Sequence, residues 1–211
     1  MKKIAITQRL MLNESYYELR EALDVRWACL FKELDFLPIV LPIEYNFEEY
    51  FKEIDIDGVL LTGGNDLYSI NNDKVAQQRD IFEKKLIKYS IVNNIPIFGV
   101  CRGVQIIAEY FGAEFKEVQN QVATKHTLKV NKKSKYFKEL NKINIVNSFH
   151  NYAVEQLSDS FLISATNDNG IIKAIEHKEY KIFGQMWHSE REKPFHIDEL
   201  NLINNFFNNE G

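Results

Sequence analysis

The sequence has little of what builds a disulfide scaffold or a metal site. Its 211 residues include two cysteines, Cys29 and Cys101, so a framework of disulfides is excluded and a reducing compartment is indicated. No CxxC or HExxH pattern is present, and the two cysteines lie far apart in the sequence. We therefore expect a protein that needs neither a metal ion nor another cofactor, and that has a free thiol available for chemistry.

Long apolar runs and an excess of positive charge are also missing. Met1-Lys2-Lys3 leads into a short apolar stretch that ends at Gln8, which is too short for a secretion signal or a membrane span. The net charge is −4 with a pI near 5.8, which does not favour binding to a phosphate backbone. We expect a cytoplasmic protein with neither nucleic acid nor a membrane as its partner. Association into a homo-oligomer stays open.

The alternation of short apolar segments with helical patterns predicts an α/β fold. In the first half it predicts helices at 15–34 and 73–93 between strands at 4–7, 37–41, 59–62 and 95–100, which indicates a parallel sheet covered on both faces. Beyond Gly112 the segments become shorter and more polar. They predict a mixed or antiparallel extension with strands near 127–130, 143–147, 161–166, 171–177 and 181–187, and a last helix at 195–207. No linker or repeat divides the chain, so we expect a single domain over residues 1–211.

A tight turn around Cys101 is the strongest sign of chemistry. The sequence Gly99-Val100-Cys101-Arg102-Gly103 follows an apolar strand and precedes a helical pattern, which is the G-x-nucleophile-x-G arrangement. Glycines flank the nucleophile because a sharp strand-to-helix turn brings backbone close to backbone. A thiol at a helix N-terminus is favoured as the thiolate, and the backbone N–H of Arg102 can donate to an oxyanion. The alternative is a small buried cysteine in an ordinary turn.

A thiolate that attacks an amide needs a histidine to protonate the leaving nitrogen. His188 ends the predicted strand at 181–187, and Glu190 follows two residues later, where it can fix the tautomer of the ring. His150 is the strongest rival, although no carboxylate stands near it in the sequence. Surface or capping roles fit the remaining histidines better, which are His126, His177 and His196. We therefore expect His188 to be the base and Glu190 to orient it.

A second glycine pair follows the predicted strand at 59–62. The sequence Gly63-Gly64-Asn65-Asp66 lacks the Lys-Ser/Thr of a P-loop and the third glycine of a dinucleotide fingerprint. We interpret it as a loop that offers a second backbone donor to the oxyanion.

Together these motifs resemble the class I glutamine amidotransferase superfamily. In order along the chain they are Thr62-Gly63-Gly64-Asn65-Asp66, Phe98-Gly99-Val100-Cys101-Arg102-Gly103-Val104-Gln105 and Trp187-His188-Ser189-Glu190. Within that superfamily, Arg102 after the cysteine, and Arg79-Asp80 with Glu83 on the preceding helix, resemble the γ-glutamyl-γ-aminobutyrate hydrolase branch, peptidase C26. Members of that branch hydrolyse γ-glutamyl amides as free-standing enzymes.

The resemblance implies a flavodoxin-like sheet and assigns roles to particular residues. Cys101, His188 and Glu190 would form the triad, and the amides of Gly64 and Arg102 would hold the oxyanion. The residues implied to hold the glutamyl group are Gln105, Asn147, Ser148, Phe149 and His150. Two departures stand out: the usual proline after the triad histidine is Ser189, and the double histidine of the family appears as His150-Asn151. The second departure suggests a different leaving group.

The start of the chain resembles one subgroup of this branch. Ala5-Ile6-Thr7-Gln8-Arg9-Leu10 and Tyr16-Tyr17-Glu18-Leu19-Arg20 look like the subgroup that acts in bacterial capsular phosphoramidate synthesis. Its members hydrolyse γ-glutamyl-CDP-amidate to glutamate and cytidine diphosphoramidate. If this chain shares that small-molecule substrate, cationic groups near the diphosphate could come from Arg9, Lys125, His126, Arg191 and Lys193, although charged surface residues are commonly just solvated.

Three other functions stay open. A glutaminase subunit that passes ammonia to a synthetase predicts glutamine as substrate and activation by its partner. A catalytically silent protein that binds a ligand predicts that Cys101 is no more reactive than Cys29. An α/β-hydrolase with the same elbow is disfavoured, because in that fold the acid precedes the histidine, whereas Glu190 follows His188.

Overall fold

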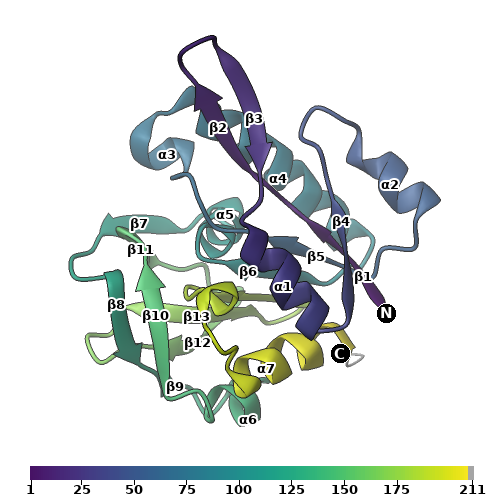
Figure 1. Cartoon of the computed structure of the whole chain (residues 1–211). Helices are drawn as coiled ribbons and strands as arrows, with labels where there is room; N and C mark the ends of the chain where they lie inside the picture. Colours follow the sequence, from purple (N-terminus) through teal and green to yellow (C-terminus); the bar gives the residue numbers. More distant parts are fainter. Residues whose placement is uncertain (209–211) are drawn as a thin grey trace.

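A computed structural model describes residues 1–208 as an α/β fold around an eight-stranded sheet (Figure 1). Five neighbouring strands are parallel, in the order β4 (Phe36–Val40), β1 (Lys2–Ile6), β5 (Gly58–Leu61), β6 (Ile97–Val100) and β14 (Ile182–Gln185). The sheet continues with antiparallel strands, in the order β13 (Ile172–His177), β12 (Phe161–Thr166) and β9 (Lys129–Val130). The predicted fold class, a mostly parallel sheet with an antiparallel C-terminal extension, is confirmed.

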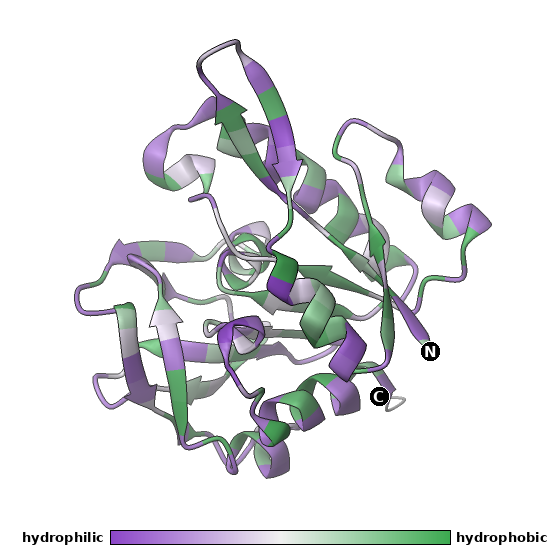
Figure 2. Ribbon diagram, viewed as in Figure 1, coloured by the Kyte–Doolittle hydropathy of each residue, from purple (hydrophilic) through white to green (hydrophobic). Residues whose placement is uncertain are grey.

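Helices cover both faces of the sheet. One face carries α1 (Val25–Glu33) and α7 (Ile197–Asn208), and the other carries α2 (Phe47–Glu53), α4 (Lys74–Val92) and α5 (Arg102–Tyr110). Figure 2 shows hydrophobic residues along the central strands and on α1 and α7. The shorter elements are α3 (Tyr68–Asn71), α6 (Phe137–Leu140) and the 3₁₀ turn η1 (Ser189–Arg191). Within residues 1–208, no helix combines the length and apolar character that crossing a membrane requires.

Three two-stranded ribbons lie outside the central sheet. They pair β2 (Arg9–Asn13) with β3 (Glu18–Ala22), β7 (Glu114–Glu117) with β11 (Tyr152–Gln156), and β8 (Val122–Thr127) with β10 (Ile145–Phe149). In Figure 1 the β2–β3 hairpin projects from the molecule at the side opposite β9 and α6. The strands β7 and β11 and the helix α2 are elements that the sequence patterns did not predict.

The helix predicted over residues 15–34 is wrong in its first half. Residues 15–22 form the turn and the second strand of the β2–β3 hairpin. In the turn, Asn13 accepts a hydrogen bond from the amide of Ser15 at 3.2 Å, and Tyr17 has φ 49°. The helix α1 begins only after its N-cap Asp24, whose carboxylate accepts the amide of Arg26 at 3.0 Å. Most apolar side chains of the hairpin are exposed. Their helical spacing therefore does not indicate the buried face of a helix.

Candidate active site

Cys101 stands at the sharp turn between β6 and α5. Its backbone adopts φ 54° and ψ −105°, a region that non-glycine residues rarely occupy. Both flanking glycines are required: a Cβ on Gly103 would lie 2.1 Å from the carbonyl oxygen of Leu61, and one on Gly99 would lie 2.7 Å from the carbonyl carbon of Gly103. The amide of Cys101 donates to the carbonyl oxygen of Gln185 at 2.8 Å, which ties the turn to β14. The elbow therefore presents the thiol at the carboxyl edge of the parallel strands.

His188 follows β14, the neighbour of β6, and so reaches the same edge as Cys101. Its Nδ1 lies 2.6 Å from Oε1 of Glu190, and both side chains are buried. The ring also faces the thiol: a Cβ on Gly63 would lie 3.6 Å from Nε2 of His188 and 3.5 Å from Cβ of Cys101. Burial alone would lower the pKa of His188, but hydrogen bonds and charge interactions with Cys101 and Glu190 raise it to about 9. The histidine is thus held as a cation between a thiol and a carboxylate.

The loop after β5 lies beside this pair and is held by a buried arginine. Arg79 on α4 donates to three successive carbonyl oxygens, at 2.8 Å to Thr62, 3.1 Å to Gly63 and 2.7 Å to Gly64. Gly64 has φ +83°, which suits glycine. Within residues 1–208, the amides of Gly64 and Arg102 donate to no protein acceptor. Both amides are therefore free to donate to a bound group.

Two guanidinium groups and two carboxylates form a closed buried network under the elbow. Glu83 accepts Nε of Arg79 at 2.9 Å and also pairs with Arg102, which in turn pairs with Asp80. The hydroxyl of Thr7 donates to Glu83 at 2.7 Å. Burial opposes the ionisation of Glu83, yet the charges of Arg102 and Arg79 keep its pKa below the usual value. The network joins the loop after β5 to the start of α5, so the two candidate oxyanion amides are fixed relative to each other.

Asn147 and Phe149, from β10, contact His188 directly. The Asn147 side chain brackets the His188 backbone: Oδ1 accepts its amide at 2.8 Å, and Nδ2 donates to its carbonyl oxygen at 2.8 Å. The ring of Phe149 packs edge-on against the imidazole, with 5.8 Å between centroids. Asn147 therefore positions His188. The sequence motifs predicted a role for Asn147 in holding the glutamyl group, but not these contacts with His188.

His150, the rival base, is engaged on both ring nitrogens. Its Nδ1 donates to the carbonyl oxygen of Tyr152 at 3.0 Å, and its Nε2 accepts from Nζ of Lys173 at 3.0 Å. Burial and the charge of Lys173 lower the pKa of His150 to about 3, so the ring stays neutral. Gln105 donates to the same Tyr152 carbonyl at 3.0 Å, while Ser148 accepts from Lys173 at 3.0 Å. This arrangement favours His188 as the base.

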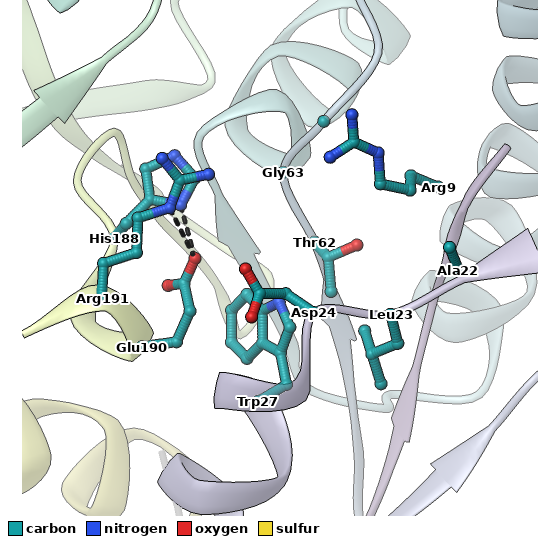
Figure 3. A pocket seen from close by; sticks show the side chains of 11 residues that line it. Arg9, Ala22, Leu23, Asp24, Trp27, Thr62, Gly63, His188, Glu190 and Arg191 are labelled. Carbon is teal, nitrogen blue, oxygen red and sulfur yellow. Dashed lines mark hydrogen bonds and ion pairs between the residues drawn. The ribbon is translucent and has the colours of Figure 1, made fainter. Parts of the chain in front are cut away.

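A cleft opens next to His188 (Figure 3). Its lining includes Arg9, the glycine pair at 63–64, and His188, Glu190 and Arg191. Figure 3 shows Arg9 and Arg191 on opposite sides of the cleft, and the guanidinium of Arg191 lies 4.4 Å from the ring centre of Phe149. The other cationic candidates do not line this cleft; they are Lys125, which lies 3.9 Å from Glu192, His126, which bonds Thr124 at 3.0 Å, and the exposed Lys193.

The family model named Peptidase C26 matches residues 4–190. The chain belongs to the peptidase C26 family. It is 37% identical over 207 residues to a γ-glutamyl-CDP-amidate hydrolase of Campylobacter jejuni. The aligned region covers 97% of this chain and 96% of that protein. A GMP synthase of Finegoldia magna is 30% identical over 75% of this chain, but the match spans 29% of that enzyme. A glutamine amidotransferase structure from Thermotoga maritima superposes with a TM-score of 0.67 and 16% identity, over 95% of this chain and 81% of that one. That last likeness supports the fold alone.

This C26 member has a buried lysine that the sequence motifs did not single out. Lys173 is 0% exposed, and its Nζ donates to Gln121 at 2.8 Å as well as to Ser148 and His150. All six residues of β13 are buried, and lysine is almost never fully buried unless its charge is paired. A lysine inside the strand predicted at 171–177 was therefore the signal that the sequence offered. Gln121, in the loop before β8, had no comparable signal.

Proposed function

We propose that this C26 member hydrolyses a γ-glutamyl amide with Cys101 as nucleophile, His188 as general acid and base, and Glu190 as the group that orients His188. The observation that carries the proposal is the buried His188 ring, whose Nδ1 lies 2.6 Å from Glu190 and whose Nε2 side faces Gly63, as the side chain of Cys101 also does. A nucleophile beside a histidine that is oriented by a carboxylate is the arrangement used in nucleophilic acyl transfer.

In the first step the sulfur of Cys101 attacks the γ-carbonyl carbon and a carbon–sulfur bond forms. The carbonyl oxygen becomes an oxyanion, which the amides of Gly64 and Arg102 stabilise by donating hydrogen bonds. When the intermediate collapses, the carbon–nitrogen bond breaks and protonated His188 gives its proton to the leaving nitrogen. The product is a γ-glutamyl thioester, and the leaving nitrogen departs as the –NH2 group of an amine or of a phosphoramidate.

In the second step water releases the glutamyl group. His188, now neutral, takes a proton from water, and the resulting oxygen nucleophile attacks the thioester carbon. The carbon–sulfur bond then breaks, glutamate leaves, and Cys101 and His188 return to their starting state. The balance is one water consumed for each amide cleaved.

As the specific substrate we propose γ-glutamyl-CDP-amidate, which would yield glutamate and cytidine diphosphoramidate. The support is the 37% identity, over nearly the whole length of both chains, to a γ-glutamyl-CDP-amidate hydrolase. Arg9 and Arg191 line the cleft beside His188, where a diphosphate leaving group would need positive charge. As part of the same proposal, we expect the reaction to take place in the cytoplasm with neither nucleic acid nor a membrane as partner; a homo-oligomer is compatible with it.

A glutaminase subunit that feeds ammonia to a synthetase is the second candidate. The likeness to GMP synthase favours it, although that match covers 29% of the relative. This function predicts free glutamine as substrate and a rate that rises when a partner synthetase binds.

Release of glutamate from a small panel of substrates tests the proposal. The panel contains γ-glutamyl-CDP-amidate, γ-glutamyl-γ-aminobutyrate and free glutamine, each with wild type, Cys101→Ala and Cys29→Ala. We expect one dominant substrate, the CDP-amidate, and loss of turnover in Cys101→Ala but not in Cys29→Ala, whose cysteine is exposed and outside the site. If the wild type releases no glutamate from any of the three, the free-standing hydrolase is refuted. Release from glutamine alone would favour the glutaminase.

A further inference from the structure

Lys173 lies at the same edge of the sheet as Cys101, although its strand runs the other way. Because β13 is antiparallel to β14, its first residues stand beside the end of β14. On one side of the end of β14, the amide of Met186 donates to the carbonyl oxygen of Lys173 at 2.8 Å. On the other side, the carbonyl oxygen of Gln185 accepts the amide of Cys101 at 2.8 Å. Two strand spacings of about 4.8 Å therefore separate the two backbones.

The ammonium group of Lys173 is buried among neutral partners. Its three hydrogen bonds go to Oε1 of Gln121, Oγ of Ser148 and Nε2 of His150, at 2.8, 3.0 and 3.0 Å. In the part of the chain that the structure describes, no carboxylate forms an ion pair with it. A buried charge without a counter-charge is strongly unfavourable unless negative charge develops nearby.

Cys101 is the group that can supply this negative charge. Burial lowers the pKa of Lys173 to about 8, and the interaction with the Cys101 thiol opposes this and raises it. Among the other ionisable neighbours, His126 and His150 have pKa values that are lowered by burial and then by the charge of Lys173, which disfavours a positive charge on either ring. His188, whose pKa is raised, also acts on His150. Because coupling between two sites is reciprocal, the ammonium favours a charged sulfur as much as the sulfur favours the ammonium.

We propose that Lys173 is a positioning residue whose buried ammonium, held by Gln121, Ser148 and His150, favours the thiolate form of Cys101 across β14. The effect is electrostatic and needs no contact between the two side chains. This inference rests on the proposed role of Cys101 as nucleophile. It adds a second cation, besides His188, that stabilises the sulfur anion before the substrate is bound.

The rate of alkylation by iodoacetamide, measured against pH, tests the proposal without any substrate. All variants carry Cys29→Ser so that a single thiol reacts, and mass spectrometry of the peptide identifies the site. In Lys173→Met we expect the second-order rate constant at pH 6.5 to fall about tenfold, as for a charge some 10 Å away at an effective dielectric constant of about 20. The rise of the rate with pH should move to higher pH. Added salt at 0.5 M should leave the difference in place, because a buried charge is weakly screened.

A control variant separates the buried charge from a surface charge. Lys129→Met removes an exposed lysine that pairs with Asp168, so this variant should alkylate within about twofold of wild type. A folded Lys173→Met protein, judged by circular dichroism, that alkylates like wild type overturns the proposal. If the methionine variant does not fold, Lys173→Gln replaces it with the same expectation. An enzyme that releases no glutamate would refute the proposed function and leave the alkylation result standing.

Discussion

Replacing Glu83 by glutamine should remove a large share of the stability of this protein. Glu83 is completely buried, where it accepts hydrogen bonds from Arg79, Arg102 and Thr7. The amide has nearly the same shape but no charge, so two buried guanidinium groups would share the single carboxylate of Asp80. Breaking a buried ion pair from one side costs about 3–5 kcal/mol, against a total stability of about 5–15 kcal/mol for a typical domain.

Urea unfolding at 25 °C, followed by circular dichroism and tryptophan fluorescence, measures this loss directly. For a chain of this length the same loss lowers Tm by roughly 6–20 °C. Glu109→Gln is the matched control, since it breaks the pair with Lys84 that joins the same two helices at 2.6 Å but is partly exposed, and it should cost about 1 kcal/mol or less. A free energy loss for Glu83→Gln no larger than that of the control would refute the view that the network is a closed, charge-balanced unit.

Four further predictions concern the proposed triad, the residue that holds its histidine, and the elbow. Glu190→Gln should lower kcat by about 10³–10⁴, with the substrate panel as the assay, because the ring of His188 loses its orienting charge. Folding raises the pKa of His188 from 6.5 to about 9, so the protonated ring stabilises the folded state. In urea unfolding, the difference in unfolding free energy between wild type and Glu190→Gln should therefore be full below pH 6.5 and disappear as the pH passes about 9. A difference that does not change with pH would contradict this. Asn147→Ala should reduce kcat by about tenfold or more with little change in KM, since the backbone of His188 loses both hydrogen bonds to the Asn147 side chain. An unchanged kcat would show that Asn147 does not position His188. Gly103→Ala should yield little soluble protein, because its Cβ would lie 2.1 Å from the carbonyl oxygen of Leu61; a normal yield of folded Gly103→Ala would contradict this.

The sequence was informative where local pattern and function coincide. The run from Gly99 to Gly103 predicts a strand-to-helix elbow because only glycine tolerates the approach of backbone to backbone, and the structure has that turn. The strand before His188 is equally plain from its apolar residues. Together these two segments specify the edge of the sheet at which Cys101 and His188 meet.

Features made by distant residues could not be read in the same way. The hairpin before Asp24 was predicted as helix because exposed tyrosines and leucines repeat at helical spacing, and burial, which distinguishes the two, depends on the rest of the fold. Asn147 was assigned to the substrate, since nothing in the sequence shows that its amide would reach the backbone of His188 across 41 positions. The partners of Lys173 come from three separate segments, so its buried charge becomes visible only in three dimensions.

The place of β14 in the sheet has a consequence for how the protein is made. Among the strands of residues 1–208, β14 comes last along the chain, yet it lies between β6 and β13, in the interior of the sheet. Until the ribosome has released it, the nascent chain carries the thiol of Cys101 beside an unpaired strand edge and lacks His188. Open edges of this kind can pair with other chains, so this stage is the one at which the chain is most exposed to aggregation. Insertion of β14 completes the sheet and brings His188 to the edge that holds Cys101, so the proposed triad forms only when this strand has paired.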